Sequence, residues 1–339
     1  MRLILLGFGT VGQGLAELIL QKQSILKDRH GLALQVVGIS DMLKGSITNP
    51  AGIDLSAALD KVKKGKPLTE LGAAFSGNAL AMVESVDADM VAEMTYTDIK
   101  TGEPATSHIK AALKKGMHVT TTNKGPLALH YHELAKLAKA GGAKFYYEGT
   151  VMSGTPVLNL VRETLAGCQI TEMKGILNGT TNYILTRMEE GLSYEDALKK
   201  AQELGYAEAV PDADVLGWDA LAKVTILANT VFGADRKPAD FPCKGITEIT
   251  SSAISAAKSR GKRFKLIGRV WREGGEVKGS VGPQEVDLSH PLAGIMGATN
   301  AVTITTDAVG EVTVIGPGAG RTPTGYSALI DILAAGGVR

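Results

Sequence analysis

The fold is decided by residues 3–12, which read Leu3-Ile4-Leu5-Leu6-Gly7-Phe8-Gly9-Thr10-Val11-Gly12. The apolar run predicts a short buried strand, and the segment from Val11 to Lys27 has the pattern of a helix. The glycines between them follow a G-x-G-x-x-G spacing. The first permits a tight turn, the second lets a pyrophosphate approach the backbone, and the third allows close helix–strand packing. The stretch therefore predicts a dinucleotide-binding turn facing a helix N-terminus, with an ordinary glycine turn as the alternative.

The next 140 or so residues continue this alternation of strand and helix. Apolar runs predict strands at 34–40, 89–94, 117–121 and 143–147. Helices are expected at 103–115 and 126–140, the second with Pro126 at its first position. Nearly continuous apolar strands separated by helices indicate a parallel sheet covered on both faces. Residues 1–150 are thus expected to form a Rossmann-type nucleotide-binding domain.

The pattern changes after Glu148. Helices are expected at 156–165, 180–190, 193–204 and 215–231, and strands at 170–177, 263–271, 277–281 and 301–306. The strands alternate polar and apolar residues, which predicts an antiparallel sheet with one solvated face. We therefore expect an α/β protein whose second domain, residues 151–315, is an α+β catalytic and dimerisation domain with a mainly antiparallel sheet. Residues 316–339 are expected to complete the first domain through a final helix at 322–335.

Composition excludes several other classes of protein. With 36 basic and 35 acidic side chains, the chain has no bulk field for nucleic acid. Its two cysteines cannot form a disulfide framework and have no zinc spacing. The apolar N-terminal run is too short for a secretion signal, and the most apolar long window, 215–234, contains Asp219 and Lys223. A cytoplasmic protein with no membrane or nucleic-acid partner is expected.

The choice between NAD and NADP stays open in the sequence. Asp41 ends the second predicted strand, where an acidic residue would bind the adenosine ribose hydroxyls and favour NAD. Lysines nearby could instead meet a 2′-phosphate, or could simply form a solvated face. These lysines are Lys44, Lys61, Lys63, Lys64 and Lys66.

Two lysines occupy unusual settings. Lys223 follows Asp219 by four residues in an otherwise apolar helix, so the two share one face and need partners. Glu208, Asp212 and Asp214 add carboxylates just upstream. Such a group could hold an ammonium through its acids and exchange a proton through the amine, although an ion pair that only fixes helix packing is the alternative. Lys124 follows a sheet strand at the edge where parallel sheets bind ligands, so it is a candidate site residue, with an ordinary solvated loop lysine as the alternative.

Several motifs together resemble homoserine dehydrogenase. They run in order from residue 7 to about residue 333 and are more specific as a set than singly. The set comprises Glu93-Met94-Thr95-Tyr96-Thr97, Thr101-Gly102-Glu103-Pro104-Ala105, Thr122-Asn123-Lys124, Gly175-Ile176-Leu177-Asn178-Gly179-Thr180-Thr181-Asn182-Tyr183-Ile184-Leu185, Gly205-Tyr206-Ala207-Glu208 with Asp214, Gly217, Asp219 and Lys223, His290-Pro291-Leu292, Asn300-Ala301, and Gly316-Pro317-Gly318-Ala319-Gly320-Arg321-Thr322-Pro323-Thr324.

The resemblance implies reversible NAD(P)H-dependent reduction of L-aspartate 4-semialdehyde to L-homoserine, on the route to threonine and methionine. It implies Lys223 as the proton-transfer lysine and Lys124 as the second lysine at the reacting oxygen. Glu208 and Asp219 would hold the substrate ammonium, Asp214 would face the hydroxyl end, and Gly179 and Thr180 would bind the carboxylate. The implied cofactor contacts are Gly7, Phe8, Gly9, Thr10, Val11, Gly12, Asp41, Thr95, Lys124 and Gly318, with Gly316 and Gly320 as further candidates.

The resemblance also implies a bound monovalent cation, sodium, and a homodimer formed through the second-domain sheet. The cation loop would comprise Glu148, Val151, Ser153 and Thr155, offering mainly carbonyl oxygens, which hard cations prefer. Val210 departs from the family pattern, where an acid usually stands, and Asp212 is a candidate replacement. A short form without the C-terminal regulatory domain of many members is expected.

Two rival functions follow from the same residues. One is another reductase of an amino-acid-like substrate, such as a diaminopimelate-type or aspartate dehydrogenase, against which the Asn178-Gly179-Thr180 block and the Asp219/Lys223 helix argue. The other is a nucleotide-sensing protein that binds NAD(P)H without turnover. The presence of Lys124, Glu208, Asp219 and Lys223 argues against it.

Overall fold

The computed structural model describes residues 1–71, 73–96 and 98–338. Thr97, the last residue of the motif that begins at Glu93, therefore lies outside the described residues. The chain divides into two compact units. Unit 1 comprises residues 1–154 and 320–339, and unit 2 comprises residues 155–319. Each unit has its own sheet, and the two are described separately below.

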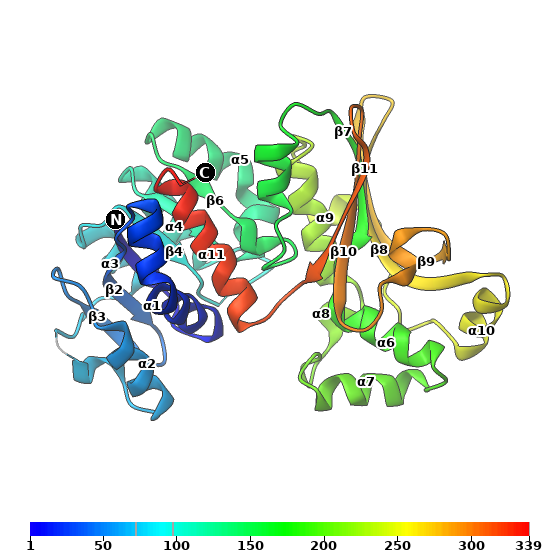
Figure 1. The fold of residues 1–339 in the computed structure, drawn as a ribbon, viewed down its shortest axis with the longest axis horizontal. Helices are drawn as coiled ribbons and strands as arrows, with labels where there is room; N and C mark the ends of the chain where they lie inside the picture. Colours follow the sequence, from blue (N-terminus) through cyan, green and yellow to red (C-terminus); the bar gives the residue numbers. More distant parts are fainter. Residues whose placement is uncertain (72, 97, 339) are drawn as a thin grey trace. The chain divides into compact units, whose positions relative to one another are not determined.

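Unit 1 is built on a six-stranded sheet (Figure 1). Its strands are β1 (Arg2–Leu6), β2 (Gln35–Asp41), β3 (Gly45–Thr48), β4 (Met90–Glu93), β5 (His118–Thr121) and β6 (Phe145–Tyr146). They lie in the order β3-β2-β1-β4-β5-β6, and every pair is parallel except β2 with β3. This confirms the predicted parallel sheet. Its strand order reverses beside β1, which creates the crevice where such sheets bind ligands.

Helices cover both faces of this sheet because β1 is apolar at successive positions. Leu3 and Leu5 pack with α1 (Thr10–His30), α2 (Leu55–Lys63) and α11 (Arg321–Ala335). Ile4 and Leu6 point to the opposite face, onto α3 (Ala79–Ser85), α4 (Ala105–Lys114) and α5 (Lys124–Ala140). Figure 1 shows α1 and α11 side by side.

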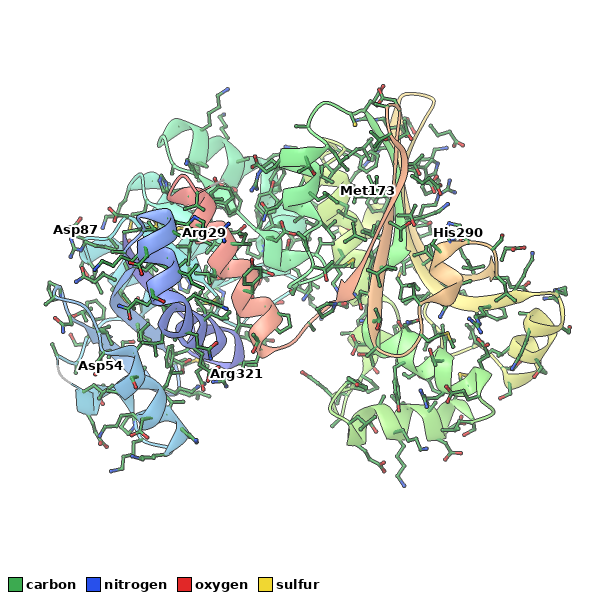
Figure 2. All side chains as sticks on the ribbon, in the orientation of Figure 1. Arg29, Asp54, Asp87, Met173, His290 and Arg321 are labelled. Carbon is green, nitrogen blue, oxygen red and sulfur yellow. The ribbon has the colours of Figure 1, made fainter. Side chains whose placement is uncertain are left out.

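The last helix, α11, is part of the core of unit 1. Its first residue is Arg321, which is labelled in Figure 2. Arg321 donates from Nε and Nη2 to the carboxylate of Glu17 on α1, at 3.0 and 2.6 Å. Further along, the buried carboxylate of Asp331 accepts hydrogen bonds from the Thr120 hydroxyl at 2.8 Å and from the Glu148 amide at 3.0 Å. One side chain of α11 therefore links β5 to the segment after β6.

Unit 2 contains an antiparallel five-stranded sheet, as predicted. The strands are β7 (Ile170–Ile176), β8 (Lys262–Glu273), β9 (Glu276–Asp287), β10 (Thr299–Thr306) and β11 (Gly310–Pro317), in the order β11-β10-β7-β8-β9. Its α-helices are α6 (Gly179–Glu189), α7 (Tyr194–Glu203), α8 (Asp212–Val215), α9 (Trp218–Thr230) and α10 (Ser251–Ser259). Ser193 caps α7 by accepting from the Asp196 amide at 3.0 Å.

The prediction that this sheet has one solvated face is wrong for strand β8. On one face, a Cβ on Gly268 of β8 would lie 2.9 Å from Val224 of α9, so the missing side chain lets that helix approach closely. On the other face, Ile267 packs with Leu292 and Ile295, and Lys265 reaches α6. Alternating polar residues predict solvent exposure, but the polar positions of this strand include Lys265, which is only 1% exposed.

Other local differences have simple backbone causes. Helix α5 begins at Lys124, so Pro126 is its third residue, which is tolerated because the first-turn amides have no intrahelical acceptor. The helix expected at 215–231 is split by Gly217, whose φ of 85° is left-handed. The helix expected at 156–165 contains a π-helical turn, Leu160–Thr164. Strand β11 was not predicted, because its C-terminal end belongs to the glycine-rich block.

Lys265 is a buried lysine with nearby acceptors. Its ammonium donates to Asn182 Oδ1 at 3.0 Å and, in a short contact, to the carbonyl of Ile295. The side-chain Nδ2 of Asn182 in turn donates to the carbonyls of Gly297 at 2.9 Å and Thr299 at 3.2 Å. Burial lowers the pKa of Lys265 to about 8, with Glu189 opposing and Arg263 adding to the effect.

This lowered pKa predicts a pH-dependent stability. Between the folded value and the normal lysine value, the unfolded chain binds more protons, so stability rises with pH. Relative to a Lys265→Met variant, the wild-type free energy of unfolding should increase by about 2 kcal/mol from about pH 7 to about pH 9.5, measured by urea unfolding. Lys262→Met, on the same strand but not buried, is the control. A flat difference between wild type and Lys265→Met would contradict the prediction.

Candidate active site

Of the three glycines in the turn of unit 1, two are closely packed against protein atoms and one borders open space. Gly7 has a φ of +87°, and a Cβ there would overlap the carbonyl of Met94. A Cβ on Gly12 would overlap the carbonyl of Gly7. Gly9 differs, since its φ of −77° suits any residue and a Cβ would meet nothing within 4 Å. Gly9 therefore leaves an open approach to the backbone before α1, and this space fits a bound pyrophosphate.

Asp41 lies beside this turn, at the end of β2. Its Oδ2 accepts from the Phe8 amide at 2.8 Å, and its Oδ1 accepts from the amides of Leu43 and Lys44, both at 3.0 Å. Burial alone would raise the pKa of Asp41, but these three amides and the nearby Lys44 ammonium hold it below its usual value. The structure thus fixes a carboxylate where a cofactor ribose is expected.

Three of the five lysines considered for a 2′-phosphate have acidic partners. Lys61 pairs with Glu70 at 2.7 Å and Lys64 with Asp60 at 2.7 Å. Lys44 lies 3.6 Å from Asp41 itself. The ammonium groups of Lys61 and Lys64 are therefore each paired with a carboxylate other than Asp41.

The carboxyl ends of β4 and β5 contribute Thr95 and Lys124. Thr95 follows β4 and donates its amide to Glu93 Oε1 at 3.2 Å. Lys124 is the first residue of α5 and is half-buried, and Asn123 before it is the helix N-cap residue. Thr95 and Lys124 therefore both lie at the ligand-binding edge of the sheet of unit 1.

In unit 2, Lys223 lies on the buried side of α9. It is 5% exposed, and its ammonium donates to the carbonyl of Leu177 at 2.5 Å and to Asp219 Oδ2 at 2.8 Å. Helix α9 can place a lysine so close to the sheet because Gly268 and Gly279 leave room for its Val224. The i,i+4 pairing predicted from sequence is thus present, with a carbonyl as a second acceptor.

Asn178 connects this pair to a second carboxylate. Its Oδ1 caps α6 by accepting from the Thr181 amide at 2.9 Å. Its Nδ2 donates to Asp214 Oδ1 at 2.6 Å and to Asp219 Oδ2 at 3.0 Å. Burial, followed by repulsion from Asp219, raises the pKa of Asp214. Asn178 is a functional residue that the sequence alone did not single out, although an asparagine between a strand and a helix is the signal of a side-chain cap.

Not every expected substrate residue joins this cluster. Thr180 does lie at the start of α6, and its hydroxyl donates to the carbonyl of Tyr206 at 2.7 Å. Glu208, in contrast, has an exposed side chain, and its backbone carbonyl accepts from Gln202 at 3.1 Å. Val210 is 73% exposed and Asp212 is exposed at the start of α8. The loop between α7 and α8 thus presents these side chains to solvent.

Several of the expected ligand-binding glycines are constrained by neighbouring protein atoms. A Cβ on Gly179 would meet the carbonyl of Ala298 at 2.5 Å. On Gly316 it would overlap the Thr155 side chain, and on Gly318 that of the buried Asn300. These contacts supply a packing reason for glycine at all three positions.

All four residues of the expected cation loop are buried. Glu148 and Val151 are 2% and 0% exposed. The hydroxyl of Ser153 donates to the Gly149 carbonyl at 2.6 Å, and that of Thr155 donates to the Pro317 carbonyl at 2.9 Å. Among the described residues, no three or more His, Cys, Asp or Glu side chains form a group suited to a metal ion. The described helices include none with the length and apolarity needed to cross a membrane.

The fold and the site are typical of a nucleotide-dependent oxidoreductase. The features that indicate this class are the parallel sheet with its open glycine turn, the acid at the end of β2, and the buried lysine–carboxylate cluster of the second unit. Comparison with known proteins narrows this class. The homoserine dehydrogenase NAD-binding domain model matches residues 7–148, and the homoserine dehydrogenase model matches residues 156–333. The chain therefore belongs to the homoserine dehydrogenase family.

Individual relatives agree over nearly the whole chain. The chain is 46% identical to the NAD(+)-dependent homoserine dehydrogenase of Pseudomonas canavaninivorans, covering 98% of this chain and 95% of that protein. It is 42% identical to the homoserine dehydrogenase of Methanocaldococcus jannaschii, covering 98% of both. A solved hyperthermophilic archaeal homoserine dehydrogenase in complex with NADPH has a TM-score of 0.84 at 32% identity, covering 99% of this chain and 97% of that one.

Proposed function

We propose that the protein reduces L-aspartate 4-semialdehyde reversibly to L-homoserine with a nicotinamide cofactor, in the biosynthesis of threonine and methionine. The single observation that carries the assignment of the site is the Lys223 ammonium, buried on α9 between the Leu177 carbonyl and Asp219. Within the described residues these acceptors use two of its three N–H bonds. We assign the third to the substrate oxygen.

The bound cofactor supplies the hydride, and Gly7, Phe8, Gly9, Thr10, Val11, Gly12, Asp41, Thr95, Lys124 and Gly318 would hold it. Lys223 would transfer the proton to or from the substrate oxygen, and Lys124 would offset negative charge on that oxygen. Both lysines have the chemistry these steps require. The open approach at Gly9 supports the binding of a pyrophosphate.

Asp214 and Asp219 support the binding of an ammonium group. Because burial and mutual repulsion raise the pKa of Asp214, a cation placed beside the two acids would favour its ionised form. We assign the substrate ammonium to Asp219 and Glu208, with Asp214 nearer the hydroxyl end. Gly179 and Thr180, at the N-terminus of α6, would bind the carboxylate. In this assignment Glu208, now exposed, must turn towards the substrate.

The test of this function is steady-state reduction of aspartate semialdehyde with NADH and NADPH in parallel. Oxaloacetate with ammonia serves as the rival substrate, and the expected result is turnover with the semialdehyde alone. Turnover with oxaloacetate and ammonia instead would indicate an aspartate dehydrogenase. Tight NAD(P)H binding without turnover of either would indicate a nucleotide-sensing protein.

We further propose a preference for NAD(H), supported by the fixed Asp41 carboxylate and the ion pairs of Lys61 and Lys64. Asp41→Asn removes the charge that repels a 2′-phosphate while keeping an oxygen acceptor. The ratio of kcat/KM for NADPH over NADH should rise by about tenfold, the equivalent of ~1.4 kcal/mol. Asp54→Asn, which alters an N-cap in the same unit, should leave the ratio unchanged. An unchanged ratio in Asp41→Asn would mean that selectivity is set elsewhere.

A monovalent cation at Glu148, Val151, Ser153 and Thr155, a homodimer and a cytoplasmic location complete the proposal. Support for the cation comes from the buried oxygen-rich segment, because hard cations prefer oxygen ligands. The dimer and the location rest on the family resemblance. Sedimentation measurements would test the dimer. Activity assays with sodium or potassium as the only monovalent cation would test the cation.

A further inference from the structure

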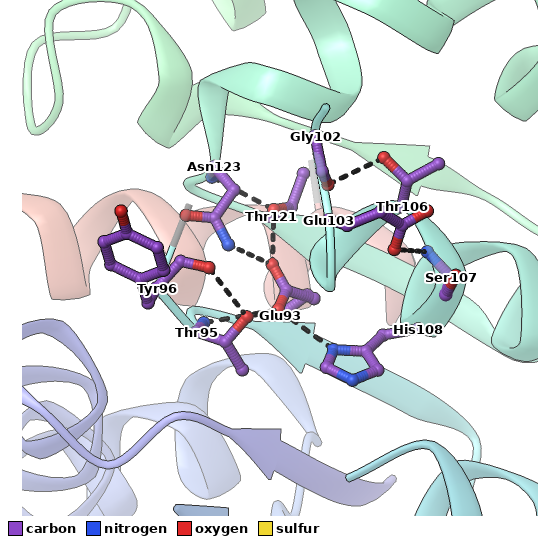
Figure 3. Close-up of polar contacts among 10 residues, drawn as sticks. All are labelled: Glu93, Thr95, Tyr96, Gly102, Glu103, Thr106, Ser107, His108, Thr121 and Asn123. Carbon is purple, nitrogen blue, oxygen red and sulfur yellow. Dashed lines mark hydrogen bonds and ion pairs between the residues drawn. The ribbon is translucent and has the colours of Figure 1, made fainter. Parts of the chain in front are cut away.

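The Glu93 side chain is a buried acid to which the proposed reaction gives no role. It is the last residue of β4 and is 0% exposed. A carboxylate removed from water needs hydrogen-bond donors to offset its lost hydration. Figure 3 shows donors converging on it from the end of β5 and from the residues that follow two adjacent strands, β4 and β5.

Each oxygen of Glu93 serves one of these segments. Oε1 accepts from the Thr95 amide at 3.2 Å and, in a short contact, from the Thr95 hydroxyl. Oε2 accepts from the Thr121 hydroxyl at 3.3 Å and, in a short contact, from Asn123 Nδ2. His108 Nδ1 of α4 lies 3.4 Å from Oε1. One carboxylate therefore links the residues after β4 to the start of α5.

The two linked segments lie at the ligand-binding edge of the sheet. Strand β4 neighbours β1, where the strand order reverses. The amide of Met94 donates to the Leu6 carbonyl at 2.8 Å, which places Thr95 next to the glycine turn. Asn123 directly precedes Lys124 at the start of α5. A shift of either segment would therefore move a residue assigned to cofactor or substrate.

We propose that Glu93 is a positioning residue that holds Thr95 and Asn123–Lys124 in the arrangement needed for cofactor binding and reduction. This inference rests on the proposed function. Its chemical basis is that a carboxylate only accepts hydrogen bonds, and here both of its oxygens receive them. An amide of the same shape has one acceptor only. Its nitrogen would face either the Thr95 N–H, which cannot reverse its role, or the Nδ2 of Asn123.

Glu93→Gln is the direct test. A glutamine that keeps its oxygen on Thr95 must turn its nitrogen towards Asn123, which disturbs the residue before Lys124. We expect kcat to fall by about tenfold or more, and the dissociation constant for NADH, measured by fluorescence, to rise by about threefold or more. The KM for aspartate semialdehyde should stay within about twofold, because its assigned binding residues Gly179, Thr180, Glu208 and Asp219 are in unit 2.

Glu103→Gln is the matched control, since its carboxylate accepts from the Ser107 amide at 3.1 Å at the start of α4. It should share any general loss of thermal stability but keep wild-type kcat and NADH affinity. If Glu93→Gln does not fold, Asn123→Ala removes one donor and should lower kcat in the same direction. A folded Glu93→Gln protein with kcat and NADH affinity within about twofold of wild type would overturn the proposal, as would unchanged kcat in Asn123→Ala.

The two proposals fail in different ways. If the wild type does not reduce aspartate semialdehyde, the proposed function is wrong, while the NADH affinities of wild type and Glu93→Gln still decide whether Glu93 orders the cofactor side. If the wild type turns over and both affinity and kcat are insensitive to Glu93, the function stands and the positioning role is refuted.

Discussion

Replacing Lys223 by methionine should lower kcat for aspartate semialdehyde reduction by about 10²-fold or more, while the dissociation constant for NADH changes little. Methionine has a similar length and suits the apolar surroundings of α9, so the substitution keeps the packing of the side chain and removes only its proton donor. Asp219 keeps the hydrogen bond from Asn178. The measurement is steady-state kinetics together with NADH fluorescence titration and a thermal melt.

Two further variants separate proton transfer from charge. Lys223→Arg keeps a cation but does not give up a proton in the working pH range, so it should restore little activity. Lys199→Met removes an exposed lysine from α7 and should behave as wild type. Near-wild-type turnover in Lys223→Met would eliminate Lys223 as the proton-transfer residue. Full activity in Lys223→Arg would show that only its charge matters.

Substituting alanine for Gly9 should weaken cofactor binding by about tenfold or more without lowering thermal stability. A Cβ at this position meets no protein atom within 4 Å, and the backbone φ of −77° is ordinary for alanine. The added methyl group would occupy the space through which a pyrophosphate approaches the turn. NADH titration and a thermal melt of the same sample measure the two effects, and about 1.4 kcal/mol of lost binding corresponds to the tenfold change.

Two other glycines provide comparison variants. Gly167→Ala also adds a Cβ to open space, and should change neither cofactor affinity nor stability. Gly12→Ala should reduce both, because its Cβ overlaps the Gly7 carbonyl. If Gly9→Ala binds NADH as tightly as wild type, the cofactor phosphates do not approach the chain at Gly9.

The parallel strands of unit 1 were predictable because their signals are local, whereas the short antiparallel edge strand β3 was not predicted. Buried parallel strands are apolar runs, and the G-x-G-x-x-G spacing fixes what connects β1 to α1. Strand β11 and the helix break at Gly217 before α9 were not predicted, because a glycine can serve a turn, a helix end or close packing within a strand. Gly217 breaks a helix through its left-handed backbone, whereas Gly268 and Gly279 lie within strands to make room for Val224.

Site residues were predictable where spacing alone brings them together, as with Asp219 and Lys223 one helical turn apart. Asn178 and Glu93 act across long separations in sequence. Asn178 contacts carboxylates 36 and 41 residues away, and Glu93 contacts Asn123 30 residues away. Only strand pairing and helix packing create such contacts. A buried carboxylate at a strand end leaves no periodic trace that distinguishes it from an exposed one.

The chain leaves unit 1 after Gly154 and re-enters it at Gly320, so unit 2 is an uninterrupted insertion. On a ribosome, all the residues of unit 2 emerge before α11 does. Its sheet can therefore assemble while β5 still lacks the Asp331 contact to Thr120, and while the face of β1 that packs with α1 and α2 still lacks α11. The nucleotide-binding unit is consequently completed only after all of unit 2 has been translated, although most of its own residues are made first.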